Sequence, residues 1–278
     1  MPSVDPGQVR ALATVVHEHD GVAAFSEQTL LNLTTPGRDV VHLPVVEGET
    51  LVAYAQLDAG SAELAVHPDH RRRGLGGRLL DDVLAAAPQT RVWAHGPHPG
   101  AARLAAGRGM HVVRELWLMT GPVPPAPAPP EVPDGVTVTT FDPDRDAEDW
   151  LAVNARAFAH HPEQGRMTRA DLDARLAEPW FDPEGFWLAR DAGTGALLAS
   201  MWTKVSDGVA EIYVLGVDPA AQGRRLGTLL TALAMHRFAS QGLREVELYV
   251  EGDNEPAIRT YRRAGLARAR ADVQYAQG

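Results

Sequence analysis

Residues 211–230 read EIYVLGVDPAAQGRRLGTLL, and this stretch decides the fold. Side chains alternate between the two faces of a strand, so every second residue is expected on one face: Glu211, Tyr213, Leu215 and Val217. Proline cannot donate to a strand ladder, so Pro219 ends the strand, and leucines at helical spacing begin at Leu226. The stretch therefore predicts a strand, a tight loop and a helix.

The loop between them, residues 222–227, reads QGRRLG and lies at the N-terminus of the predicted helix. Backbone N–H groups there have no partner inside the helix, and the positive end of the helix dipole favours an anion. The loop therefore predicts a pyrophosphate cradle. A solvated face is the less favoured interpretation of its two arginines.

A second loop, HPDHRRRGLG at residues 67–76, follows the predicted strand Ala62–Val66 and precedes another leucine-rich helix. The two loops correspond at a constant shift of 151 positions, which pairs Val66 with Val217 and Gly76 with Gly227. An internal repeat of domain size is the economical explanation.

The copies are separated by a proline-rich segment. Residues 121–133 contain seven prolines, which favours an extended, semi-rigid spacer over a ligand for a proline-reading module. We therefore expect an N-terminal domain at residues 1–120, a linker at 121–134 and a C-terminal domain at 135–278.

The length, net charge and cysteine content of the chain agree with two domains and exclude several classes of protein. A chain of 278 residues can bury two cores. The formal net charge of -10 argues against a general nucleic-acid binder, which must neutralise phosphates. The absence of cysteine removes disulfides, thiolate metal sites and a cysteine acyl-enzyme. With no bilayer-length apolar run and no signal peptide, we expect a cytoplasmic monomer that binds no membrane.

The motif around residues 222–227 resembles the acyl-coenzyme A signature of the GNAT acetyltransferase superfamily, Gln/Arg-x-x-Gly-x-Gly/Ala. Residues 71–76 fit it fully, whereas Arg225 replaces the first glycine in the second copy. The helix that carries Asn254, Ala257 and Tyr261 is similar to the last segment of that superfamily. The resemblance implies an α/β fold of the α+β type: two tandem GNAT domains, each with a mixed, mostly antiparallel sheet flanked by helices.

The chemistry of acetyl transfer gives Glu211 and Tyr261 roles. An amine attacks a thioester only when it is unprotonated, so Glu211 is the candidate base and Tyr261 the candidate acid for the leaving thiolate. Backbone N–H groups near Leu215 are candidates for stabilising the carbonyl oxygen. The repeat places Gly60 opposite Glu211 and Ala105 opposite Tyr261, so the N-terminal copy is expected to be catalytically degenerate. Without the motif, an edge carboxylate and a half-buried ring would be the better interpretations.

Segments along most of the chain, such as HPEQG at residues 161–165 and WFDP at 180–183, resemble the mycothiol synthase family of actinobacteria. That resemblance implies transfer of acetyl from acetyl-CoA to the cysteine amine of desacetylmycothiol, a cysteinyl-glucosaminyl-inositol pseudo-disaccharide, which gives mycothiol and CoA. The acceptor residues it implies are Glu27, Glu163, Lys204, Glu211 and Tyr249.

The same resemblance implies two acetyl-CoA sites. In the C-terminal copy the residues are Leu215, Gly216, Val217, Gln222, Gly223, Arg224, Arg225, Leu226, Gly227, Thr228, Asn254, Glu255, Pro256, Ala257, Ile258 and Arg259. In the N-terminal copy they are Leu64, Ala65, Val66, Arg72, Arg73, Gly74, Leu75, Gly76 and Gly77.

Three alternatives stay open. Histidine pairs such as His67 with His70 have a spacing that metal sites use, but no cysteine or ordered set of carboxylates accompanies them, so we expect no metal. A second alternative is a tandem GNAT enzyme that acetylates another amine, such as an aminoglycoside. A non-catalytic acyl-CoA sensor would bind the coenzyme without turnover.

Overall fold

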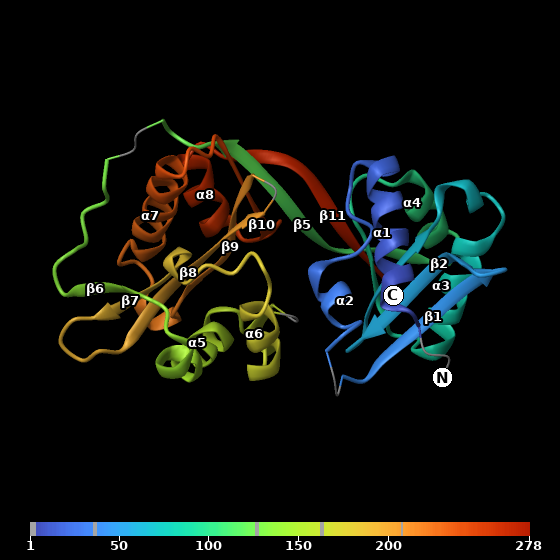
Figure 1. Ribbon diagram of the computed structural model, residues 1–278, viewed down its shortest axis with the longest axis horizontal. Coiled ribbons are helices and arrows are strands. Elements are labelled where there is room, and N and C mark those ends of the chain that lie inside the picture. Colours follow the sequence, from blue (N-terminus) through green and yellow to red (C-terminus); the bar gives the residue numbers. More distant parts are fainter. Residues whose placement is uncertain (1–3, 36–37, 126–127, 162–163, 207) are drawn as a thin grey trace. The chain divides into compact units, whose positions relative to one another are not determined.

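The computed structural model describes residues 4–35, 38–125, 128–161, 164–206 and 208–278, and it divides into two compact units (Figure 1). Unit 1 contains Met1–Trp117, Glu251–Asp253 and Arg270–Gly278, and unit 2 contains Leu118–Val250 and Asn254–Ala269. The units therefore interleave in the sequence. The linker expected at residues 121–134 begins inside a strand, and its residues 126–127 lie outside the described part. The domain division itself stays a prediction.

Unit 1 is a sheet covered by helices on both faces. Its strands are β1 (Val40–Glu47), β2 (Thr50–Asp58), β3 (Ser61–Val66), β4 (Arg91–Ala94), the C-terminal part of β11 (Ala267–Gln277) and the first part of β5 (Met110–Pro122). The first three strands form an antiparallel meander, β4 runs parallel to β3, and β11 pairs antiparallel with β4. β3 lies where the sequence predicts the strand Ala62–Val66.

The helices of unit 1 are α1 (Pro6–Asp20), α2 (Glu27–Leu31), α3 (Leu75–Ala86) and α4 (Pro99–Ala106). Successive side chains of β2 point to opposite faces of the sheet, and their contacts show which helix covers which face. Tyr54 packs with Val9 and Leu12 of α1, whereas Ala53 and Ala55 pack with α3. Each face of the sheet is therefore apolar and buries one layer of helix.

Unit 2 repeats this plan. Its strands are β6 (Val136–Thr140), β7 (Phe186–Asp191), β8 (Leu197–Ser206), β9 (Val209–Val217) and β10 (Glu245–Glu251, whose last residue belongs to unit 1). Its helices are α5 (Pro143–Ala157), α6 (Arg169–Leu176), α7 (Leu226–Ser240) and α8 (Glu255–Arg263). Strands β6 to β9 are antiparallel, and β10 is parallel to β9. Fully buried Trp150, Phe186 and Trp202 pack in one aromatic core, with Phe186 and Trp202 stacked at 4.6 Å.

The parallel strands separate early in both units. The register of β9 with β10 ends at Ile212 and Leu248, and that of β3 with β4 ends at Ala62 and Val92. Beyond these points the backbone of residues 215–217 and 64–66 no longer pairs with the parallel neighbour. Those two segments are the ones at which the sequence predicts coenzyme contacts.

A β-bulge in β9 corrects one prediction. Trp202 of β8 pairs with Val214 and Thr203 pairs with Ile212, so Tyr213 is an extra residue. Glu211 pairs with Lys204 and stays on the face of Trp202, as does Tyr213 in the aromatic core. Leu215 and Val217 instead lie against Gly227 of α7. The expected single face of four residues is therefore wrong, because the bulge reverses the alternation.

Candidate active site

The loop before α7 presents free backbone donors. Gly223 and Arg225 have left-handed backbone (φ 83° and 60°), and Arg225 is the N-cap without a side-chain cap. The first bond at this end runs from Leu229 N to Arg225 O at 3.1 Å, so the helix itself does not use the earlier N–H groups. Gly227 carries no side chain toward Leu215 and Val217. This is the geometry of an anion cradle.

The loop before α3 has left-handed residues at the same two positions, but arginine comes first and glycine second. Arg72 and Gly74 are left-handed (φ 64° and 83°), and they correspond to Gly223 and Arg225 at the shift of 151. Arg225, the residue that departs from the signature, therefore leaves the loop conformation unchanged.

Arg225→Gly should relieve the strain of a left-handed arginine, and we expect the free energy of unfolding to rise by up to about 1 kcal/mol. The same change removes a cation from the cradle and should raise the acetyl-CoA KM a few-fold. Urea denaturation and steady-state kinetics measure the two effects. Arg72→Gly is the matched control, with a similar gain in stability and unchanged turnover. A loss of stability in Arg225→Gly would contradict the strain argument.

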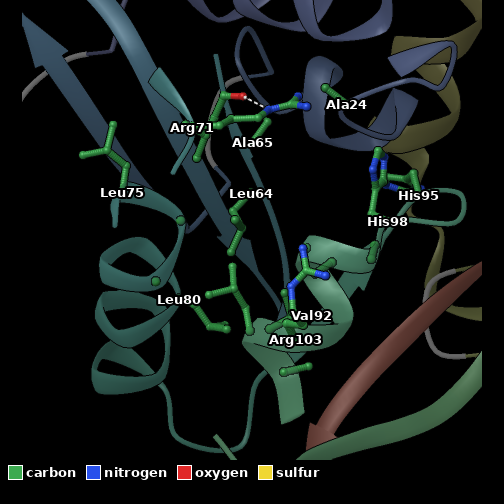
Figure 2. Close-up of a pocket in the computed structure, with 18 of the residues that line it drawn as sticks. Ala24, Leu64, Ala65, Arg71, Leu75, Leu80, Val92, His95, His98 and Arg103 are labelled. Carbon is green, nitrogen blue, oxygen red and sulfur yellow. Dashed lines mark hydrogen bonds between the residues drawn. The ribbon is translucent and has the colours of Figure 1, made fainter. Parts of the chain in front are cut away.

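A cavity of about 740 Å³ lies in unit 1 beside the loop of residues 67–76. Its lining contains eight of the nine residues predicted for the N-terminal coenzyme: Leu64, Ala65, Val66, Arg72, Gly74, Leu75, Gly76 and Gly77. Arg73 is the one that is not among the lining residues. Figure 2 shows part of this lining, with Leu64 from β3, Leu80 from α3 and Arg103 from α4 around one space.

An ion pair at this cavity was not predicted from the sequence. The Arg71 guanidinium donates to both carboxylate oxygens of Asp20, at 2.8 and 2.7 Å. Its Nε donates to Val66 O at 3.1 Å (Figure 2). The hydrogen bonds from Arg71 lower the pKa of Asp20 to about 2. Arg71 therefore ties the end of α1 to the end of β3.

His95 lines the same cavity and lies between two buried carboxylates. Its Nδ1 is 3.0 Å from Asp272 of β11, and its Nε2 is 3.2 Å from Glu63 of β3, an ion pair whose angles fall short of a hydrogen bond. Burial lowers the pKa of His95, but Glu63 and Asp272 outweigh burial and raise the pKa to about 10. Burial raises the pKa of each carboxyl group, and His95 outweighs that effect and lowers it. His95 is thus a cation at neutral pH.

On the face of the unit 2 sheet that carries Trp202, the structure brings Lys204 and Glu211, two of the predicted acceptor residues, together as cross-strand partners. The Lys204 ammonium lies 4.7 Å from the ring centroid of Trp180 and 5.4 Å from that of Tyr213. Arg175 Nε donates to Tyr213 Oη at 2.8 Å. Aromatic rings and an arginine therefore hold the side chains beside Glu211, a role that the sequence did not indicate.

The other predicted acceptor residues are dispersed in the sequence. Tyr249 lies on β10 of unit 2 with 39% of its surface exposed. Glu27 begins α2 in unit 1. Glu163 lies outside the described residues.

Among the residues predicted to contact the coenzyme, Asn254 is the N-cap of α8, and its side chain accepts a hydrogen bond from Ala257 N at 3.2 Å. Glu255 and Arg259 form an exposed ion pair one turn apart, and Ile258 is fully buried. Tyr261 is 6% exposed, and burial raises the pKa of its phenol well above the usual range. The phenol therefore stays protonated over the whole neutral range.

Comparison with known proteins identifies the family. The model of the Acetyltransferase (GNAT) family matches residues 12–110 and 149–266. The chain belongs to this family. A GNAT acetyltransferase uses acetyl-CoA as its acetyl donor, which agrees with the two anion cradles.

Relatives cover the whole length. The chain is 49% identical to the mycothiol acetyltransferase of Cellulomonas flavigena, over 99% of this chain and 86% of that protein. It is 49% identical to that of Thermobispora bispora, over 98% of this chain and 95% of that protein. Among solved structures, a tandem GNAT protein from the clavulanic acid pathway matches with a TM-score of 0.75 and 23% identity, over 97% of this chain and 93% of the other. These matches establish two tandem GNAT repeats.

Two absences concern the described residues only. In that part of the chain no group of three or more His, Asp or Glu side chains is arranged to hold a metal ion. Within the same ranges, no helix combines the length and the apolar character that crossing a bilayer requires.

Proposed function

We propose that this GNAT acetyltransferase transfers acetyl from acetyl-CoA to the cysteine amine of desacetylmycothiol, giving mycothiol and CoA. The observation that carries the proposal is the identity of 47 to 49% over nearly the full length to proteins named mycothiol acetyltransferase. A small, hydroxyl-rich acceptor also suits the carboxylate and ammonium that share the acceptor face of β8 and β9.

The bulge in β9 supports a division of labour between the two faces. Glu211 on the acceptor face takes the proton of the amine, and the nitrogen forms its bond to the thioester carbon. N–H groups of residues 215–217, which have left the parallel ladder, stabilise the oxyanion. The carbon–sulfur bond then breaks, and Tyr261 protonates the leaving thiolate. The residues of unit 2 proposed to bind the sugar and inositol hydroxyls are Lys204, Tyr249 and Glu163. Glu27 belongs to unit 1 and stays a sequence prediction.

Tyr261→Phe should lower kcat about 100-fold, which is within the usual contribution of a general acid. The KM for acetyl-CoA should stay within about two-fold, because the ring that packs α8 is kept. The raised pKa of Tyr261 also predicts that this group causes no fall of kcat up to pH 10 in the wild type. Initial rates from pH 6 to 10 measure both effects. An unchanged kcat in Tyr261→Phe would remove the acid assignment.

For the N-terminal cavity we propose a second acetyl-CoA that is bound without transfer. β3 runs in register with β2 without a bulge, and Gly60 and Ala105 stand where unit 2 has Glu211 and Tyr261. Calorimetric titration of the purified protein should give two coenzymes per chain. Gly76→Trp, which would fill the space next to Leu104 and Val66, should reduce this to one and leave turnover measurable.

The deciding experiment is acetylation of desacetylmycothiol by the purified protein, followed by product mass and by release of free CoA thiol. We expect turnover far above that with glucosamine or an aminoglycoside. Faster turnover of another amine would assign a different acceptor to the same fold. Acetyl-CoA binding without turnover of any amine would favour a sensor. Sedimentation should show a monomer, which we propose acts in the cytoplasm without a nucleic-acid or membrane partner.

A further inference from the structure

The cavity of unit 1 contains an apolar part beyond the residues predicted to bind the coenzyme. Its walls come from α3, β4, α4, β5 and β11, and the side chains are Leu80, Val92, Leu104, Ala105, Met110 and Tyr275. Four of these side chains are only 2% to 6% exposed and belong to the hydrophobic core of the unit: Leu80, Val92, Ala105 and Met110. Figure 2 shows Leu80 and Val92 apart from the polar lining residues His95 and His98. The cavity therefore runs from a polar region into the core.

Residue 105 helps to keep this part of the cavity open. Aligning Gly109 with Gly265 pairs Ala105 of α4 with Tyr261 of α8. Tyr261 places a whole ring in the interior of unit 2, where it is 6% exposed, whereas the side chain of Ala105 ends at Cβ. The alanine therefore leaves room that a phenol would take. Because the walls are aliphatic and aromatic, an apolar ligand group gains most from filling this room.

The other face of β3 gives a ligand no comparable room. Leu64 packs with α3, so Glu63 lies on the opposite face, the one that α1 covers. Glu63 is 6% exposed and accepts a hydrogen bond from Ser26 N at 2.8 Å. His95 lies 3.2 Å from the same carboxylate. Buried charged groups therefore occupy this side, and an apolar chain is better accommodated along the α3 face.

A coenzyme A thioester matches both regions of the cavity. Its pyrophosphate suits the backbone N–H groups of the loop at residues 71–76. Its acyl end suits the apolar part, because β3 and β4 separate after Ala62 and Val92, and Val92 is itself a wall of that part. We propose that unit 1 binds the coenzyme A thioester of an aliphatic acid longer than acetate, and that Ala105 sets the acyl length. This inference rests on the proposed binding of a coenzyme in unit 1 and names its acyl group.

The test compares the affinities of acyl-CoA thioesters for the unit 1 site. Calorimetric titration of the wild type and of Gly76→Trp, which blocks that site, gives the unit 1 binding by difference. Burial of each added methylene should strengthen binding about three- to four-fold, so butyryl-CoA should bind about ten-fold more tightly there than acetyl-CoA. The site that remains in Gly76→Trp should show no such gain, because Tyr261 stands at the position of Ala105.

Ala105→Tyr introduces the residue of the other copy and should remove the gain for butyryl-CoA, while acetyl-CoA binding at the unit 1 site stays within about three-fold. The matched control is Ala106→Tyr, which adds the same ring at the exposed neighbouring position of α4 and should keep the gain. If Ala105→Tyr does not fold, Ala105→Val, which fills less of the space, should reduce the gain in part.

Three results would overturn the proposal: butyryl-CoA binding no tighter than acetyl-CoA at the wild-type site, a gain that survives Ala105→Tyr, or a gain that Ala106→Tyr removes as well. A single coenzyme per chain in the wild type would remove the unit 1 site and this inference with it. Turnover of desacetylmycothiol is measured separately, so failure of the proposed acetyl transfer is distinguished from failure of the acyl preference.

Discussion

Glu211→Gln is expected to lower kcat/KM for the amine acceptor about 100- to 1,000-fold, the range that a positioned general base contributes. The amide keeps the size of the side chain beside Lys204 but cannot take a proton from the attacking amine. The KM for acetyl-CoA should change little, because the bulge at Tyr213 puts Glu211 on the face away from α7. Initial rates with each substrate varied in turn measure these effects.

The control for this variant is Glu245→Gln, which changes an exposed carboxylate at the start of β10 and should leave kcat/KM within two-fold. Raising the pH increases the fraction of unprotonated amine in solution, so part of the lost rate should return in alkaline buffer. Normal turnover of Glu211→Gln at every pH would remove the base assignment.

The free energy of unfolding should fall as the pH rises from 6.5 to about 10. His95 has an ordinary pKa of 6.5 when unfolded and a pKa of about 10 in the folded protein. Its stabilising contribution is therefore complete below pH 6.5 and is lost as the pH approaches 10. Between these values the folded state binds one more proton, which gives a slope of about -1.4 kcal/mol per pH unit at most. Urea denaturation at a series of pH values measures the slope.

His95→Gln should remove this slope and, at pH 7, lower the free energy of unfolding by about 3 to 5 kcal/mol. The reason is that the buried Glu63 and Asp272 carboxylates lose the cation between them. His19→Gln is the control, since His19 is an exposed histidine paired with Asp20 and should cost far less. A variant at position 95 that kept the wild-type slope would show that another group causes it.

The sequence predicts the local elements well because their signals are local. The strand, loop and helix at residues 211–230 follow from alternation, from Pro219 and from leucine spacing, and the structure has β9 and α7 there. The left-handed loop conformation does not follow in the same way, because Arg225 takes a backbone that favours glycine. The repeat shows that arginine is tolerated in this loop. Arg72, which corresponds to Gly223, also has a left-handed backbone.

The bulge could not be read from the pattern. Buried and partly exposed residues alternate along β9 without interruption from Ala210 to Val217, so periodicity gives no sign of the extra residue. What reverses is the face to which each buried side chain points, and that depends on the partner strand β8. The contact of His95 with Asp272 was missed for a related reason. The two residues lie more than a hundred positions apart in the sequence, and no local spacing connects them.

The pairing of β11 with β4 has a consequence for how the protein is made. Unit 1 contains most of the first 117 residues, yet the strand beside β4 and the carboxylate beside His95 come from Arg270–Gly278. A ribosome makes these residues only after unit 2, so until then the nascent chain holds an open sheet edge and lacks one anion for its buried imidazolium. Closure of unit 1 therefore waits until unit 2 has been synthesised, and a change within residues 270–278 would act on a unit whose other strands were made much earlier.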